Sequence, residues 1–116
     1  MDTGDVFDPN CPTRVVLDRI GDKWSVLVLL SLSDGPMRFT ALRDRIGGVT
    51  PKVLTQTLRT MEHDGLISRK IFAEVPPRVE YALTDLGGSL HGPIAVVATW
   101  AEQNVSKILE SRELSA

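Results

Sequence analysis

The residues best suited to chemistry lie in the segment 50–64, which carries several hydrogen-bonding side chains and no carboxylate before its last turn. At about 100° of rotation per residue in a helix, Leu54, Leu58 and Met61 fall on one narrow apolar stripe. The opposite face carries the hydrogen-bonding side chains, namely Lys52, Thr55, Gln56, Arg59 and His63. Arginine and lysine can bind guanine, glutamine can pair with adenine, and threonine can contact a base or the thymine methyl group. This face can therefore bind base edges, although any solvated helix face can carry such residues.

The same segment has the clearest helix-start pattern in the chain. Thr50 is a good N-cap, Pro51 suits the first helical position, and no breaker follows until Gly65. A shorter helix over residues 40–46, with Thr40 as its N-cap, is predicted just before it, and a glycine-containing connection joins the two. The order helix, turn, helix predicts a helix-turn-helix.

Two further helices are predicted upstream. Cys11 as N-cap and Pro12 at the first helical position predict a helix to about Ile20. Asp22 can cap a second helix over residues 23–33, whose nearly continuous apolar surface indicates burial on most sides.

Two β-like runs, 66–72 and 79–83, are joined by the stretch AEVPPRVEY at residues 73–81, whose last three residues begin the second run. The two adjacent prolines cannot donate ladder hydrogen bonds, and each biases the residue before it toward extended backbone. The stretch therefore belongs at the tip of a stiffened hairpin, where its arginine is a candidate for a phosphate or minor-groove contact. The other interpretation is an edge strand protected against aggregation. The residues assigned to this hairpin site are Lys70, Pro76, Pro77 and Arg78.

A last helical region is predicted after the cap Thr84-Asp85. The glycines at 87, 88 and 92 and the proline at 93 predict a kink or two helical pieces. Beyond them apolar side chains recur every three or four residues, and a small domain has no partner left for this stripe. We expect it to pair with the same helix of a second chain. The stripe consists of Ile94, Val97, Trp100, Ala101, Val105 and Ile108.

Length and charge indicate one domain with a local basic surface. A chain of 116 residues that is 42% hydrophobic and 24% charged is an ordinary soluble single domain. Its net charge of −2 argues against binding polyanions through bulk charge. Between residues 38 and 78, however, eight basic residues stand against four acidic ones, so the middle of the chain can present a basic face.

Several classes of protein are excluded. The single cysteine rules out an intrachain disulfide, and the two histidines have no paired spacing to carboxylates, so no metal site and no cofactor are expected. The longest apolar run, 24–32, is far shorter than the ~20 residues of a membrane-spanning helix. The acidic N-terminus lacks the features of a secretory signal, so the cytoplasm is the expected compartment. No catalytic pairing of side chains is evident, so an enzyme is not expected.

Five motifs occur in the order in which a known family has them. They are CP at 11–12, IGDKW at 20–24, RFTALR at 38–43, TPKVLTQTLRTMEHDGLI at 50–67 and EVPPRVEYALTDLG at 74–87. Together they resemble the HxlR-type transcriptional regulators, over roughly residues 11–109. The looser glycine-rich stretch 86–93 departs from a continuous helix in that family's pattern.

The resemblance implies a mainly α fold with a small β-hairpin, a winged helix-turn-helix that dimerises through its terminal helices and is related to the MarR-like group. It implies a cytoplasmic homodimer that binds double-stranded DNA at an inverted repeat, with 1–10 as a flexible N-terminal tail, 11–109 as the domain and 110–116 as a C-terminal tail. The recognition helix would bind through Thr50, Lys52, Thr55, Gln56 and Arg59, the hairpin would be the wing, and Arg38 and Arg43 would contact the backbone. A winged-helix module that binds an acidic protein instead of DNA is the alternative.

Cys11 is a separate question. A cysteine at a helix N-terminus, with Arg14 three residues on, has a stabilised thiolate. Some HxlR-type regulators resemble this chain in carrying a redox-sensing cysteine at this position, which implies an oxidant as effector; a small molecule is the other kind of effector. A capping residue without a sensing role is the alternative.

Overall fold

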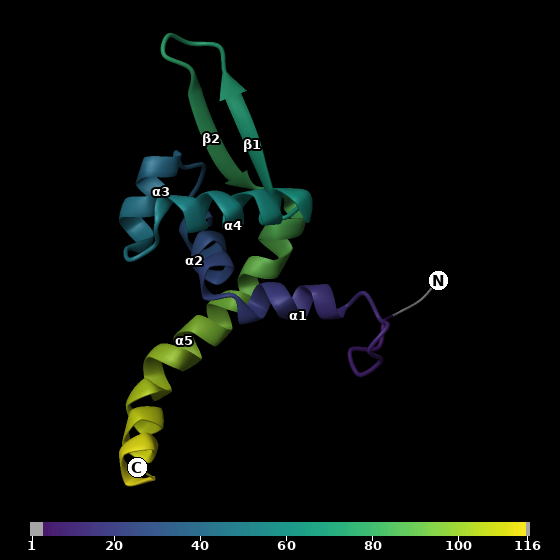
Figure 1. Cartoon of the computed structure of the whole chain (residues 1–116), viewed down its shortest axis with the longest axis vertical. Helices are drawn as coiled ribbons and strands as arrows, with labels where there is room; N and C mark the ends of the chain where they lie inside the picture. The colour runs from purple at the N-terminus through teal and green to yellow at the C-terminus, as the bar shows by residue number, and fades with distance from the viewer. Residues whose placement is uncertain (1–3, 116) are drawn as a thin grey trace.

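The computed structural model describes residues 4–115, which form five helices and one antiparallel hairpin (Figure 1). In chain order these elements are α1 (Arg14–Gly21), α2 (Lys23–Leu32), α3 (Phe39–Ile46), α4 (Pro51–His63), β1 (Ile67–Phe72), β2 (Arg78–Leu83) and α5 (Asp85–Leu114). The strands pair in register from Ile67 opposite Leu83 to Phe72 opposite Arg78. The arrangement is a winged helix-turn-helix, as the sequence predicts.

Three helix starts are confirmed, each by a side-chain cap. The carboxylate of Asp22 accepts from the Trp24 backbone N–H at 3.0 Å, which starts α2. The hydroxyl of Thr50 accepts from the Val53 N–H at 3.2 Å, and that of Thr84 accepts from the Gly87 N–H at 3.1 Å. Each cap satisfies a backbone donor that the helix itself leaves unpaired.

Two predicted caps are wrong. The helix α1 begins at Arg14 with Thr13 as N-cap, and Cys11 lies in the preceding turn, where the Arg14 N–H donates to its carbonyl at 3.3 Å. The helix α3 begins one residue before Thr40 and has no side-chain cap. The start of α3 depends on a tertiary contact. Met37 exchanges backbone hydrogen bonds of 2.9 and 2.8 Å with Tyr81 of β2, and the chain turns into α3 directly after this bridge.

The helix α2 lies at the centre of the core and packs against α1, α3, α4, α5 and β2. Its buried Val28, Leu29 and Leu32 belong to one apolar cluster with residues of the surrounding elements. In Figure 1 the hairpin rises on one side of α4, α2 lies on the other, and α5 extends away from this body toward the C-terminus. The residues that complete the buried cluster are Leu42, Val49, Leu54, Leu58, Met61, Leu66, Ile67 and Ile94.

The helix α5 is continuous, so of the two predicted alternatives, a kink or two helical pieces, the division into two pieces is wrong. It contains Pro93 and runs to Leu114, inside the segment 110–116 that the sequence sets apart as a tail. The glycine at its start has a packing role, because a Cβ built on Gly87 would lie 2.0 Å from the Leu66 carbonyl oxygen. Gly88 has nothing within 4 Å of such a Cβ. Gly87 therefore allows α5 to pack against the chain that enters β1.

These two neighbouring glycines provide a matched test of that contact. Gly87→Ala should lower the free energy of unfolding by about 1–3 kcal/mol, because the backbone at Leu66 must move. Gly88→Ala should be neutral or raise it by up to about 1 kcal/mol, because alanine is the better helix former and its methyl group meets open space. Urea unfolding of both variants at one protein concentration measures the difference, and equal effects would contradict this role of Gly87.

Candidate nucleic-acid interface

The outer face of α4 is polar and open to solvent. Lys52, Gln56 and Arg59 are exposed and Thr55 is half-buried, whereas Leu54, Leu58 and Met61 are buried in the core. The predicted division of this helix into two faces is therefore confirmed. The exposed side chains border a single shallow surface hollow, lined by Pro51, Lys52, Val53, Thr55, Gln56 and Arg59.

This face carries uncompensated positive charge. Within residues 4–115 neither Lys52 nor Arg59 forms an ion pair, and the carboxylates of the same helix come only in its last turn. By contrast, Arg43 lies 3.6 Å from Asp44, and Arg45 lies 3.4 Å from Asp34. A polyanion that approaches α4 would therefore meet two cations that have no carboxylate partner among the residues described.

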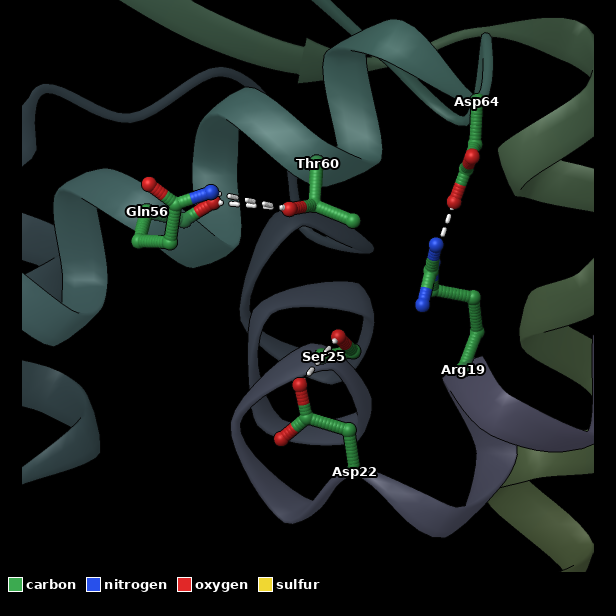
Figure 2. A network of polar contacts seen from close by, with 6 residues as sticks. All are labelled: Arg19, Asp22, Ser25, Gln56, Thr60 and Asp64. Carbon is green, nitrogen blue, oxygen red and sulfur yellow. Dashed lines mark hydrogen bonds and ion pairs between the residues drawn. The ribbon is translucent and has the colours of Figure 1, made fainter. Parts of the chain in front are cut away.

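Thr60, which the sequence did not single out, contacts one of the base-reading candidates. Its hydroxyl donates to the Gln56 backbone carbonyl at 3.0 Å, and the Gln56 carboxamide nitrogen reaches that hydroxyl at 3.5 Å (Figure 2). The spacing of four residues on one helix is the pattern that could have identified the pair. The contact leaves the carboxamide oxygen of Gln56 available as an acceptor.

The hairpin places its proline pair at the tip, as predicted. Pro76 and Pro77 are exposed in the connection between β1 and β2, beyond the last paired residues. Lys70 is exposed on β1 with its ammonium group 4.9 Å from the centre of the Phe72 ring. Arg69, which the sequence analysis did not select, is exposed on the other face of the strand and forms no ion pair among the residues described.

Arg78 does not extend freely from the hairpin. One terminal nitrogen of its guanidinium lies 3.1 Å from the Glu74 carboxylate, and its Nε lies 3.4 Å from that of Glu80. The guanidinium carbon is 4.0 Å from the centre of the Phe72 ring. The side chain is 28% exposed. A contact between Arg78 and DNA would require the guanidinium to leave these three partners.

An ion pair that the sequence could not suggest joins α1 to the end of α4. The guanidinium Nε of Arg19 donates to the Asp64 carboxylate, and Asp64 is the C-cap of α4 (Figure 2). The hydrogen bond with Asp64 raises the pKa of Arg19 above its usual value. Both residues border a cavity of about 310 Å³ whose other walls are mostly apolar and come from α1, α5 and the chain that enters β1.

Cys11 is buried, at 6% exposure, and its sulfur is hydrogen-bonded. The Asp5 backbone N–H donates to the sulfur at 3.1 Å, and the Thr13 hydroxyl lies 3.1 Å from it. The side-chain hydrogen bond with Thr13 has the largest effect on the pKa of the thiol, which lies below its usual value; backbone hydrogen bonds and the charge of Arg14 act in the same direction, against burial. The thiolate is therefore stabilised by these hydrogen bonds, and only weakly by Arg14.

The residues proposed for dimerisation separate into two groups. Ile94 is 1% exposed and packs in the core of its own chain, so it is not available to a second copy. Along the rest of α5, Val97 and Trp100 are 54% and 57% exposed, and Ala101, Val105 and Ile108 are exposed as well. The sequence did not assign α1 to this surface, although its Val15, Val16, Leu17 and Ile20 are also exposed.

Other kinds of site are not found in the part of the chain that the structure describes. Between residues 4 and 115 no three acidic, histidine or cysteine side chains come together as metal ligands would. No helix in that range has both the length and the apolarity to cross a membrane.

Comparison with known proteins gives matches to helix-turn-helix regulators. The model of the HxlR-like helix-turn-helix family matches residues 19–109. The chain is 42% identical over 110 residues to YtfH of Escherichia coli (strain K12), named as an HTH-type transcriptional regulator, covering 95% of this chain and 87% of that protein.

Solved structures give the same result. YtfH from Salmonella typhimurium, named as a transcriptional regulator, superposes with a TM-score of 0.86 at 43% identity, covering 95% of this chain and 98% of that one. The redox regulator HypR in its oxidized form superposes with a TM-score of 0.76 at 37% identity, covering 81% and 97% of the two chains.

Proposed function

The chain belongs to the HxlR-like helix-turn-helix family of transcriptional regulators, and on this premise we propose that it binds double-stranded DNA as a homodimer at an inverted repeat. The family is one of regulators, not of enzymes. The observation that carries the proposal is the exposed face of α4, which has two cations without an ion pair among residues 4–115 and no carboxylate before its last turn.

In the proposed complex α4 enters the major groove. A helix of about 10–12 Å diameter fits a groove about 12 Å wide. Lys52, Thr55, Gln56 and Arg59 would reach base edges from the outer face, and Thr50 would lie at the entrance of the helix. Arg38, exposed just before α3, and Arg43 would contact phosphates, which fix register without selecting sequence.

Two copies would dimerise through the exposed apolar side chains of α5. Such an area of valine, isoleucine and tryptophan on a helix that extends away from the body is stabilised by burial against a second copy. Two-fold symmetry would match two half-sites about one turn of DNA apart. We place this dimer in the cytoplasm, where bacterial DNA is found.

We propose that the regulator responds to oxidants through Cys11. The hydrogen bonds that lower the pKa of its thiol support this, as does the similarity to the redox regulator HypR. Two thiols would lose two electrons and two protons to the oxidant and form a disulfide, the second thiol coming from the other copy or from a small thiol. A small-molecule effector is the alternative signal.

The roles of α4 and α3 can be separated by their sequence dependence. Arg59→Ala should weaken binding to the operator by roughly 10- to 100-fold and relax base preference, because alanine cannot hydrogen-bond a base. Arg43→Ala should weaken all sequences alike and reduce the dependence of affinity on salt. Fluorescence anisotropy with the intergenic DNA beside the chain's own gene and a scrambled duplex measures both effects.

The reverse pattern would show that the two arginines are misassigned. Binding that is insensitive to salt and to sequence, with preference for an acidic protein, would instead favour a winged-helix module for protein interaction.

Dimerisation can be tested by sedimentation at micromolar concentration. The native chain should have the mass of two copies, and Val105→Glu should have the mass of one, because it buries a charge in the interface. Gln103→Glu, on the same exposed helix but off the apolar stripe, is the control and should stay dimeric. A one-chain mass for the native protein would contradict the proposal.

The redox response can be tested with diamide. Cys11→Ser should bind the operator with unchanged affinity and ignore the oxidant, whereas binding by the native chain should change, because only the native chain has a thiol to oxidise. An equal response of both proteins to diamide would contradict the proposed role of Cys11 as the oxidant sensor.

A further inference from the structure

We propose that Arg78 is a positioning residue that holds the wing in shape, and that Arg69 is the cation through which the wing contacts DNA phosphate. The proposal rests on the DNA binding proposed above and changes the role that the sequence predicts for Arg78. It follows from what the two arginines touch in the structure.

The tip of the wing has few backbone contacts of its own. In the connection 73–77 the hydrogen bond from the Glu74 N–H to the Phe72 carbonyl, 2.9 Å, is the one found beyond the strand pairing. Pro76 and Pro77 have no N–H to donate. All five residues of the connection are exposed to solvent. Side chains must therefore supply most of what fixes its conformation.

Arg78 joins the three parts of the hairpin tip. Its guanidinium pairs with Glu74 in the connection and with Glu80 on β2, and it covers the ring of Phe72 on β1, the residue opposite it in the register. The Nε atom is shielded from solvent and has no hydrogen-bond partner among the residues described, so its 3.4 Å contact with Glu80 is an ion pair without a hydrogen bond. A planar group with several donors can make all of these contacts at once, which a lysine ammonium cannot.

Electrostatics opposes a move of Arg78 onto DNA. The guanidinium would gain one phosphate contact and leave two carboxylates, Glu74 and Glu80, unpaired beside a polyanion. With Arg78 in place the three groups carry one net negative charge, and Lys70, opposite Glu80 in the register, balances it. This face of the wing then neither repels nor attracts DNA strongly.

Arg69 and Lys70 are the two hairpin cations without an ion pair among residues 4–115, but the ammonium of Lys70 lies over the Phe72 ring and its residue is opposite Glu80 in the register. Successive residues of a strand point to opposite faces, so Arg69 lies on the face away from Lys70, Phe72 and the Arg78 contacts. It is exposed, and its partner in the register is Tyr81, not a carboxylate. Its charge is therefore uncompensated in the described part of the chain and free to neutralise a phosphate.

The dependence of DNA affinity on salt distinguishes the two roles. Arg69→Gln should reduce the slope of log affinity against log salt by about 0.9 for each phosphate that the wing no longer neutralises. Arg78→Gln should leave the slope unchanged and weaken binding about twofold to tenfold, because the loop must be ordered on binding. Arg78→Lys should behave like Arg78→Gln. A slope that falls in Arg78→Gln and is restored in Arg78→Lys would overturn the proposal. The probe is the scrambled duplex described above.

Hydrogen exchange in the free protein tests the same assignment without DNA. Arg78→Gln, Arg78→Lys and Glu74→Gln should each speed exchange of the amides at 72–80, and Arg69→Gln should not. Unchanged exchange in the α4 amides shows that the fold is intact. Equal exchange in all variants would overturn the positioning role. If the native chain shows no salt-dependent DNA binding, the proposed function and the Arg69 contact fail together, and hydrogen exchange still decides the role of Arg78.

Discussion

The burial of α2 is the constraint on which the rest of the structure depends. This helix packs against four other helices and one strand, so it connects the elements that contribute side chains to the core. Burying each leucine of such a cluster contributes about 2 kcal/mol. The apolar stripe of α4 packs against α2 and the start of β1, and this packing determines the direction in which the remaining side chains of the helix point.

That single orientation produces the polar surface. Because Leu54, Leu58 and Met61 face the core, Lys52, Gln56 and Arg59 must face solvent. The hairpin follows directly after α4 and is attached to the same core through Ile67 and the Met37–Tyr81 bridge. The wing and the helix are therefore held in a defined relation, although most of the wing lies outside the core.

A chain with a net charge of −2 can bind a polyanion only if some of its cations are not neutralised by nearby carboxylates. Ion pairs within the chain create this difference between its cations. Arg19, Arg45 and Arg78 have carboxylate partners that join separate segments or shape the hairpin tip, and Arg43 makes only a solvent-exposed contact with its neighbour Asp44, whereas Lys52, Arg59 and Arg69 have none among residues 4–115. The sequence therefore suggests more basic residues as DNA-binding candidates than are free of carboxylate partners. The ion pairs in the structure show which basic residues are free.

The sequence alone determined the features that depend on near neighbours: the caps of α2, α4 and α5, the two faces of α4 and the existence of the hairpin, because periodicity and capping act within a few residues. Only the tertiary structure decided the start of α1 and α3, the continuity of α5 past Gly87, the burial of Ile94 and the Arg19–Asp64 pair. Each of these depends on how separate elements pack against one another. The partners of Arg78 lie closer in the chain, but their contact depends on how the hairpin closes, which the sequence does not show.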